Sequence, residues 1–293
     1  MTDCIIIGSG LAGISASLTL QANGKSFILL GRKDLSEKIA KAEKIHNYPG
    51  LSDITGQAFV SALQNQLDEA KITVTEKRAM GVYALGDKFG VATQEGDYYE
   101  SKTVIFALGV ESVREIKGET EFAGRGVSYC ATCDGFLYKG KKIAVLCTSK
   151  RLEHEILHLA DFAKTLYLIP MYKPVEINRE NIRILQKMPV EIRGENRVES
   201  LVFSVPPAED MAKELTIDGV FVLRESASPA VLIAGLEMQN GHIVVDRAMR
   251  TNIAGCFSAG DCTGRPYQYA KAVGEGNIAG HSVSEYLAKL SKK

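Results

Sequence analysis

Continuous apolar runs alternate with amphipathic segments along this chain, in an order that predicts a parallel sheet covered by helices. Residues 3–7 form a run rich in β-branched side chains. Glycines separate this run from a helical segment over 14–23, which Gly24 can end. A second apolar run over 26–30 completes a strand–helix–strand unit. Such runs are typical of parallel strands, because both faces of a parallel sheet are buried. The fold class predicted from the N-terminus is therefore α/β.

The same pattern continues along the chain and contains a second strand–helix–strand unit. The further elements predicted, in chain order, are a helix over 57–70, short strands between 72 and 91, a strand over 103–107, a strand over 142–146, a helix over 152–162, a strand over 165–169, strands between 243 and 260, and a helix from about 277 to 290. Two such units in a chain of 293 residues predict two Rossmann-like domains.

The turn after the first strand carries Gly8, Gly10 and Gly13, which have the spacing of a dinucleotide-binding turn. The first glycine permits the tight turn, and the second lets a pyrophosphate approach the backbone. The third lets the helix pack closely on the strand. A purely structural turn is the alternative, but the strand–turn–helix context favours a dinucleotide. The acidic residue that commonly binds the ribose is absent, since residues 31–33 are Gly-Arg-Lys.

A pair of cysteines, Cys130 and Cys133, is followed directly by Asp134. Their spacing allows a small, reducible disulfide, and the neighbouring carboxylate can carry protons for the thiolates. A zinc site is the alternative, but it needs a second pair of ligands at suitable spacing. Cys147 and the five histidines supply no such pair. We therefore predict redox catalysis and no metal site.

The overall charge of the chain is balanced, with 35 Lys and Arg against 35 Asp and Glu. No net field therefore directs it towards nucleic acid or an anionic membrane. Neither a signal peptide nor a run of about 18 apolar residues is visible. The six cysteines are scattered apart from one pair, unlike a secreted disulfide framework. We expect a cytoplasmic protein with no nucleic-acid or membrane partner.

Together these motifs resemble the low-molecular-weight thioredoxin reductase family over nearly the whole chain. The segments that carry the resemblance are the glycine turn, Asn47-Tyr48-Pro49-Gly50, Ala107-Leu108-Gly109, the C-x-x-C-Asp segment, and Ala259-Gly260-Asp261 with Gln268 behind it. The resemblance implies FAD as cofactor, because the aspartate of the last motif holds the ribityl and phosphate region in that family. The FAD-binding residues implied are Gly8, Ser9, Gly10, Ala12, Gly13, Lys38, Asn47, Ala107, Gly109, Gly260, Asp261 and Gln268.

The resemblance also implies a domain organisation. The FAD domain is discontinuous, 1–110 and 222–293, and a smaller redox domain, 111–221, is inserted into it. Members of the family are usually homodimers. Their two domains rotate relative to each other, so we expect the short links near Val110 and Val222 to act as hinges.

The chemistry implied by the resemblance runs through the C-x-x-C pair. In that family the second cysteine, here Cys133, faces the flavin. The first cysteine, here Cys130, attacks the disulfide of thioredoxin, and Cys133 then resolves the mixed disulfide. Thioredoxin is therefore the expected substrate.

The central domain departs from the family where NADPH normally binds. After the strand, residues 147–152 are Cys-Thr-Ser-Lys-Arg-Leu, with none of the glycines that a dinucleotide turn needs. The His-Arg-Arg that binds the 2′-phosphate in the family is replaced by Pro-Met-Tyr at 170–172. Both halves of the NADPH site are therefore missing. The alternative is an unusual but working nucleotide site.

This departure makes the chain most similar to the ferredoxin-dependent flavin thioredoxin reductases, so ferredoxin is the expected electron donor. A ferredoxin near −400 mV and a thioredoxin near −270 mV differ by about 130 mV, or roughly 6 kcal/mol for two electrons. The lysine-rich segments 139–142 and 32–44 are candidate ferredoxin contacts, although a solvated surface is their ordinary role. The alternatives are another donor (NADPH, a deazaflavin or a second flavin) and a flavin-binding redox sensor without turnover.

Overall fold

The computed structural model divides into two compact units. Unit 1 comprises residues 1–110 and 228–293, and unit 2 comprises residues 111–227. The structure describes residues 1–110, 116–224 and 232–291, without the side chains of Glu37 and Lys38. Each unit contains a mostly parallel sheet with helices, which confirms the predicted α/β class.

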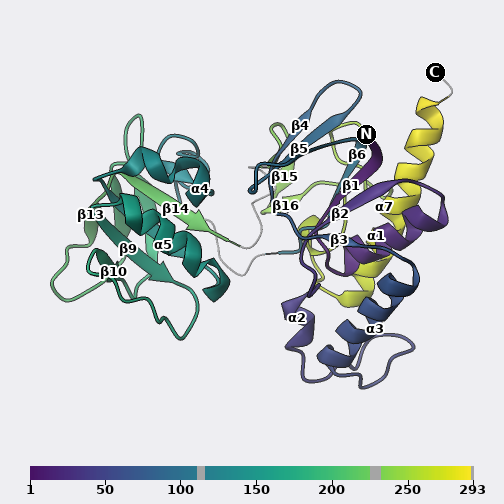
Figure 1. Cartoon of the computed structure of the whole chain (residues 1–293), viewed down its shortest axis with the longest axis horizontal. Coiled ribbons are helices and arrows are strands. Elements are labelled where there is room, and N and C mark those ends of the chain that lie inside the picture. Colours follow the sequence, from purple (N-terminus) through teal and green to yellow (C-terminus); the bar gives the residue numbers. More distant parts are fainter. Residues whose placement is uncertain (111–115, 225–231, 292–293) are drawn as a thin grey trace. The chain divides into compact units, whose positions relative to one another are not determined.

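Unit 1 is built on a seven-stranded sheet in the order β3-β2-β1-β6-β5-β4, with β17 beside β6 (Figure 1). Its strands are β1 (Thr2–Ile7), β2 (Phe27–Leu30), β3 (Val74–Thr75), β4 (Ala79–Ala84), β5 (Phe89–Thr93), β6 (Tyr98–Phe106) and β17 (Cys256–Ser258). β1 and β17 both run parallel to β6, and their last residues, Ile7 and Ser258, lie opposite Phe106. The carboxyl ends of these three strands therefore lie at the same edge of the sheet.

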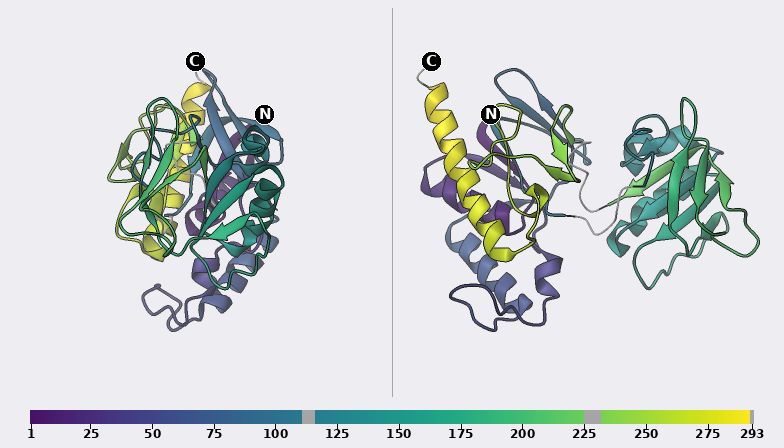
Figure 2. Two further views of the ribbon diagram at one scale, coloured as in Figure 1. Left: turned by 90° about the vertical axis from the view of Figure 1, so that its left-hand side faces the viewer. Right: turned by 180° about the vertical axis from the view of Figure 1, so that it is seen from behind.

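The helices of unit 1 are α1 (Leu11–Ala22), α2 (Glu37–Ala40), α3 (Gly56–Glu69) and α7 (Tyr269–Leu290). A short hairpin, β15 (Met238–Gln239) with β16 (His242–Ile243), and the 3-10 turn η3 (Asp261–Thr263) complete the unit. Helices α1 and α7 lie side by side (Figure 2).

Helix α7 begins at Tyr269, so the start predicted near residue 277 was wrong. Glycines in its first turns weaken the helical pattern in the sequence, but close packing against α1 requires such small residues. A Cβ atom on Gly276 would lie 2.2 Å from the carbonyl oxygen of Ala12, and one on Gly280 would lie 2.8 Å from Cβ of Thr19. The tertiary contact therefore outweighs the low helix propensity of glycine.

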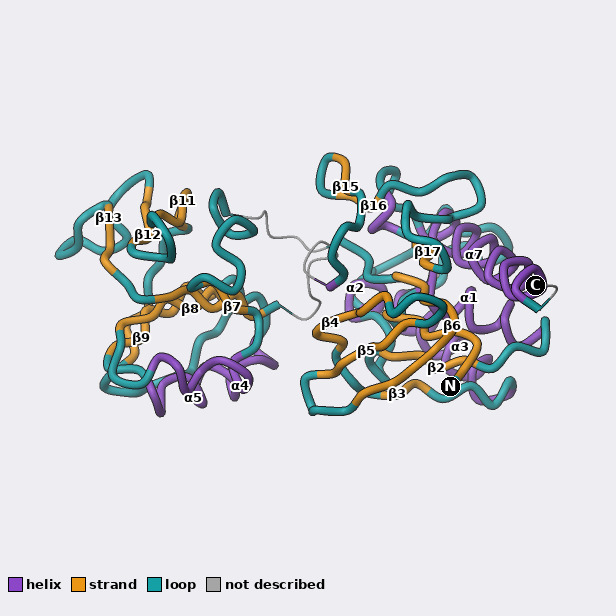
Figure 3. Tube along the Cα trace, turned by 90° about the horizontal axis from the view of Figure 1, so that it is seen from above, coloured by secondary structure: helices purple, strands orange, loops and turns teal. Residues whose placement is uncertain are grey.

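Unit 2 contains a five-stranded parallel sheet in the order β10-β9-β8-β14-β7. Its strands are β7 (Val127–Ser128), β8 (Lys142–Cys147), β9 (Thr165–Pro170), β10 (Ile182–Ile184) and β14 (Gly219–Leu223). Helices α4 (Ala131–Asp134) and α5 (Glu153–Phe162) lie on one face of this sheet. The antiparallel strands β11 (Pro189–Arg193), β12 (Ser200–Phe203) and β13 (Glu214–Thr216) lie on the other (Figure 3).

The expected link near Val222 does not lie there. Val222 is fully buried inside β14, where it pairs with Leu146 of β8, so residues up to Leu223 belong to the sheet of unit 2. The division between the units falls at residue 227 instead. The predicted boundary at 221/222 falls inside β14, because nothing in the sequence marks the last residue of this strand.

A buried ion pair joins distant parts of unit 2. The two guanidinium nitrogens of Arg224 lie 3.0 Å from the two carboxylate oxygens of Glu119, whose side chain is 1% exposed. Glu119 also accepts hydrogen bonds from the backbone N–H of Ile116 and from the hydroxyl of Tyr129. Tyr129 precedes the first redox cysteine, so the pair connects both ends of unit 2 with the redox segment.

We expect Arg224→Leu to lower the free energy of unfolding by about 3–5 kcal/mol, because a buried carboxylate loses its counter-charge. Urea unfolding followed by circular dichroism measures this. The matched control is Arg193→Leu, which removes a half-exposed partner of Glu191 and should cost at most about 1 kcal/mol. The double variant E119L/R224L should recover most of the loss. Equal costs for the buried and the exposed pair would contradict the prediction.

No helix in the described parts of the chain is both long and apolar enough to cross a membrane.

Candidate active site

The turn between β1 and α1 is built by glycines with different tasks. Gly8 has a φ of +116°, and a Cβ atom there would lie 2.2 Å from the carbonyl oxygen of Ala107. A Cβ atom on Gly13 would lie 1.8 Å from the carbonyl oxygen of Gly8. A Cβ atom on Gly10, in contrast, would meet no described atom within 4 Å. Gly8 and Gly13 therefore serve the packing of the turn, whereas Gly10 leaves open space at its surface.

The first turn of α1 is suited to bind an anion. Gly10 is its N-cap, without a capping side chain, and no acidic residue lies in its first turn. The free N–H groups and the positive end of the helix dipole therefore remain available for a phosphate group.

Ser9 fixes this turn to the end of β2. Its hydroxyl donates to the carbonyl oxygen of Arg32 at 2.9 Å and accepts from the N–H of Arg32 at 2.7 Å. A Cβ atom on Gly31 would lie 2.4 Å from this hydroxyl, so glycine is needed there. At the end of β2, where a ribose-binding acid is usual, this chain has Arg32. Its side chain pairs with Asp34.

The other predicted cofactor residues of unit 1 are placed as follows. Gly260, at φ +89°, lies against Ala12, since a Cβ atom there would be 2.9 Å from that of Ala12; Asp261 follows directly. The Asn47 amide donates to the Gln268 amide oxygen at 2.7 Å. Gly109, at φ +68°, has open space around it. The Lys38 side chain lies outside the described part of the structure.

These residues fit a dinucleotide. Gly8, Ser9, Gly10, Ala12, Gly13, Ala107 and Gly260 are brought together where β1, β6 and β17 end. The space that a side chain at Gly10 would fill, next to the unblocked start of α1, suits a pyrophosphate. The site is thus a cradle that a dinucleotide cofactor such as FAD would occupy.

Unit 2 carries the redox pair. Cys130 and Cys133 form a disulfide at the start of α4, and the N–H of Cys133 donates to the Cys130 sulfur at 3.1 Å. Cys130 is buried, whereas Cys133 is exposed. A hydrogen bond to sulfur favours its thiolate form, so reduction would leave Cys130 with a stabilised anion.

Asp134 is connected to the cysteines through Ser128, a residue that no sequence motif singles out. The Ser128 hydroxyl donates to the Asp134 carboxylate at 2.6 Å and accepts from the N–H of Cys130 at 3.2 Å. This serine lies two residues before the first cysteine, and only the fold shows that its side chain turns towards the carboxylate. The arrangement orients one carboxylate oxygen next to the redox pair.

The other cysteines do not have the environment of a redox site. Cys4, Cys147, Cys256 and Cys262 are all buried. Burial raises the pKa of the Cys4 and Cys256 thiols to about 12 and also raises that of Cys262. The thiols of Cys4, Cys256 and Cys262 therefore stay protonated and unreactive near neutral pH.

The turn after β8, where a second dinucleotide would bind, is filled by side chains. The Cys147 thiol donates to the carbonyl oxygen of Ser149 at 3.2 Å, and the Ser149 hydroxyl accepts from the N–H of Arg151. Leu152, in the next short turn η2 (Lys150–Leu152), is buried. None of residues 147–152 is a glycine, in contrast to Gly10 in the first turn.

The helix behind this turn begins with acidic residues. Helix α5 carries Glu153 and Glu155 in its first turn, where α1 has no acidic residue. Burial and the neighbouring Glu153 raise the pKa of Tyr172, which occupies the place expected for a phosphate-binding cation. Acidic residues are common in the first turn of any helix, so the sequence alone gives Glu153 and Glu155 no special meaning. Only the fold places them behind the second turn. They weaken the attraction of this helix start for an anion, although Lys150 and Arg151 of the preceding turn are basic.

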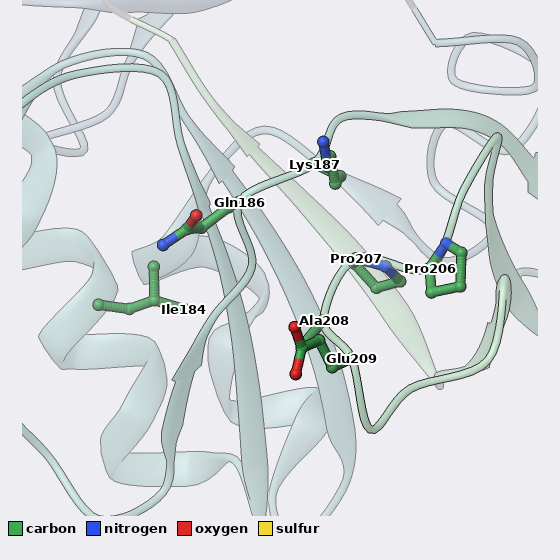
Figure 4. Close-up of a pocket in the computed structure, with 7 residues that line it drawn as sticks. All are labelled: Ile184, Gln186, Lys187, Pro206, Pro207, Ala208 and Glu209. Atoms are coloured by element: carbon green, nitrogen blue, oxygen red, sulfur yellow. The ribbon is translucent and has the colours of Figure 1, made fainter.

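A hollow of about 540 Å³ lies elsewhere in unit 2. Figure 4 shows Ile184, Gln186 and Lys187 on one side and the segment 206–209 on the other. Its lining contains no cysteine, histidine or predicted site residue, so it is not a candidate for the redox chemistry.

A glycine-built dinucleotide cradle in one α/β unit and a reducible disulfide in the other define a class, the dinucleotide-dependent disulfide oxidoreductases. Comparison with known proteins gives the family. The family described as pyridine nucleotide-disulphide oxidoreductase matches residues 2–152 and 175–276. The chain belongs to this family, and it is a FAD-dependent disulfide oxidoreductase of the thioredoxin reductase type.

Individual relatives agree with this assignment. A thioredoxin reductase of Helicobacter pylori is 34% identical, with 98% of this chain and 99% of the relative covered. A crystal structure of a ferredoxin-flavin thioredoxin reductase from Clostridium acetobutylicum is 40% identical, with 100% and 99% coverage and a TM-score of 0.88. An atypical thioredoxin reductase from Desulfovibrio vulgaris is 28% identical, with 99% coverage of both chains and a TM-score of 0.68.

Proposed function

We propose that this protein reduces thioredoxin with electrons that ferredoxin supplies through FAD. The observation that carries the proposal is the contrast between two helix starts. Helix α1 begins behind an open glycine turn without acids, whereas α5 begins behind a filled turn and carries Glu153 and Glu155. This contrast favours a single dinucleotide site, in unit 1, while the disulfide in unit 2 supplies the exchange chemistry. The Clostridium acetobutylicum relative named for ferredoxin supports the same interpretation.

In this proposal the residues of unit 1 bind the cofactor. The N–H groups behind Gly10 hold the pyrophosphate, and Asp261 binds the ribityl and phosphate region. Asn47 and Gln268 fix each other at the rim of the site. FAD, when bound, supplies a centre that takes up single electrons and gives up a pair.

The residues of unit 2 perform the exchange chemistry. The Cys130–Cys133 disulfide accepts two electrons and becomes a dithiol. The Cys130 thiolate, stabilised by the N–H of Cys133, attacks the disulfide of thioredoxin and forms a mixed disulfide. The Cys133 thiolate then attacks Cys130, which releases reduced thioredoxin and restores the Cys130–Cys133 disulfide. Asp134, oriented by Ser128, donates the proton that the departing thiolate takes up.

The surface next to the disulfide suits a protein substrate. Phe136 and Leu137, which follow the redox segment, are 59% and 54% exposed. Exposed apolar side chains beside a reactive site are typical of protein contacts. The names of the relatives make thioredoxin the substrate that we propose, and the family resemblance makes a homodimer the assembly that we propose.

The proposal is tested by anaerobic turnover. Reduced ferredoxin should bleach the bound flavin, and thioredoxin dithiols should then appear at one per two electrons. A reduced deazaflavin or a second flavin protein replaces ferredoxin in parallel reactions, and faster turnover with either would identify a different donor. Flavin reduction without any thioredoxin turnover would contradict the enzyme and leave a redox sensor.

We expect Gly10→Val to weaken FAD binding without unfolding the chain. The backbone of Gly10 has φ −76° and ψ −175°, which valine adopts readily, and its side chain would meet only the space assigned to the pyrophosphate. FAD affinity should fall at least about tenfold. Flavin absorbance per protein and a melting curve measure the two effects.

Gly13→Val is the matched control, because its side chain would collide with the carbonyl of Gly8. This variant should lose stability as well as FAD. If Gly10→Val retained wild-type flavin content, the pyrophosphate position would be wrong.

We expect Asp134→Asn to slow thioredoxin reduction by about 10²–10⁴-fold, because asparagine cannot donate the proton. Flavin reduction by the donor should be unchanged, which stopped-flow absorbance measures separately. Ser128→Ala removes only the hydrogen bond that orients the carboxylate and should have a smaller effect. An unchanged turnover of Asp134→Asn would exclude Asp134 as the proton carrier.

A further inference from the structure

A single lysine of helix α7 binds both ends of the loop that carries Asp261. The ammonium group of Lys271 donates to the carbonyl oxygens of Gly260 and Gly264, each at 2.9 Å, and to the hydroxyl of Thr263 at 3.0 Å. These residues span η3, with Asp261 at its start. The three N–H groups of the ammonium are thus engaged with the loop.

Glu275 completes the network from the next turn of α7. One of its carboxylate oxygens accepts from the N–H of Gly260 at 2.9 Å and from the Thr263 hydroxyl at 2.7 Å. The same oxygen lies 3.2 Å from the Lys271 ammonium. Both side chains are only 17% exposed. The i,i+4 pair therefore binds the donors and the acceptors of this loop at once.

The loop needs such support because its backbone is unusual at both ends. Gly260 has a φ of +89° and Gly264 a φ of +128°, a region that favours glycine. Glycine is also flexible, so a loop between two glycines loses much conformational entropy when it becomes ordered. Hydrogen bonds from a charged ammonium and to a charged carboxylate are the strong kind, and they hold both glycine ends in place.

The pair also leaves Asp261 as the net charge of the loop. Lys271 and Glu275 neutralise each other, and burial together with the charge of Asp261 raises the pKa of Tyr269 of α7. A change that removed Lys271 alone would leave Glu275 as a second negative charge close to Asp261 and to a bound phosphate. The affinity for a dinucleotide would then fall by more than the loss of the hydrogen bonds alone would cause.

We propose that Lys271 and Glu275 are positioning residues, which preorganise the Gly260–Gly264 loop so that Asp261 meets FAD without a cost of ordering. The inference rests on the proposed role of Asp261 in FAD binding. The pair acts through the loop, and its removal shows first in how long FAD stays bound.

The test measures the release of FAD from the purified holoenzyme, followed by the rise of flavin fluorescence well below the melting temperature. Lys271→Met should release FAD at least about tenfold faster, since it removes charge-assisted hydrogen bonds at both ends of the loop. Lys271→Arg, which keeps the cation, should recover part of the loss. Lys289→Met, on the exposed last turn of the same helix, is the matched control and should release FAD like the wild type.

A cycle with Asp261→Asn separates positioning from general stability. If Lys271 acts through Asp261, Lys271→Met should add less than about threefold to the release rate in the Asp261→Asn background. Equal effects in both backgrounds would overturn the proposal, as would a Lys271→Met variant that melts earlier without FAD yet releases FAD at the wild-type rate. Should Asp261→Asn itself leave FAD release unchanged, the assigned role of Asp261 fails, whatever Lys271 does. Thr263→Val offers a milder variant, which should speed release by a smaller factor.

Discussion

Replacement of either Cys130 or Cys133 by serine should lower thioredoxin reduction by at least about 10³-fold, because serine can neither form the disulfide nor leave from it. The two variants should differ in what they trap. Cys133→Ser should accumulate a mixed disulfide between Cys130 and thioredoxin, since the resolving thiol is gone. Cys130→Ser should accumulate none. Non-reducing electrophoresis and mass spectrometry identify the species.

The geometry makes this a sharp test of which sulfur attacks. Cys133 is the exposed residue of the pair, but the Cys130 sulfur accepts a hydrogen bond from the N–H of Cys133, and the proposed mechanism gives the attack to Cys130. Trapping by Cys130→Ser instead would reverse the two roles. Cys4→Ser is the control: this thiol is buried in the sheet of unit 1 with a pKa of about 12, and its loss should leave turnover unchanged.

The second large effect concerns the donor: NADPH should reduce the flavin at least about 10²-fold more slowly than reduced ferredoxin does. Two charge-assisted phosphate contacts, worth about 1.5–3 kcal/mol each, amount to roughly 10²–10⁴-fold in affinity when lost. We attribute the expected difference to unit 2, where Cys147 and Ser149 make hydrogen bonds within the turn after β8 and Tyr172 takes the position of the family's phosphate-binding cation. Anaerobic stopped-flow absorbance of the flavin measures the rates.

Dithionite provides the control for this comparison, because it reduces the flavin without a binding site. The chemically reduced enzyme should reduce thioredoxin normally, so that a missing NADPH reaction is assigned to binding alone. Rapid bleaching by NADPH would mean that the turn at 147–152 binds a nucleotide after all. The protein would then be an NADPH-dependent reductase with an altered turn.

The parts of the molecule that depend on neighbouring residues in the chain were predictable. The strand–turn–helix at Gly8, Gly10 and Gly13 is a local pattern, and the structure gives each glycine a distinct environment that accounts for it. The same holds for the disulfide between Cys130 and Cys133, whose short spacing brings the sulfurs together. Local sequence therefore sufficed for the fold class and for the centre of each candidate site.

The parts that depend on tertiary contacts were not predictable. The early start of α7 was missed because Gly276 is explained only by its contact with Ala12. Glu119 and Arg224 are separated by 105 residues, and no local pattern announces a buried ion pair. Lys271 and Glu275 have the i,i+4 spacing of a helical ion pair. Their hydrogen bonds to the Gly260–Gly264 loop depend on tertiary structure, so the sequence does not reveal them.

Unit 1 is formed by two separate segments of the chain, and this has a consequence for the order in which the protein folds during synthesis. Strand β17 and helix α7 complete the cofactor-binding sheet and the Asp261 loop, and they leave the ribosome after residues 111–227. The intervening residues 111–227 form a continuous unit, which can fold before β17 pairs with β6. During synthesis the nascent chain would therefore carry a folded disulfide unit before it can hold flavin. Cofactor loading would then follow the folding of unit 2, and a chain truncated before β17 would carry the Cys130–Cys133 disulfide without bound FAD to reduce it.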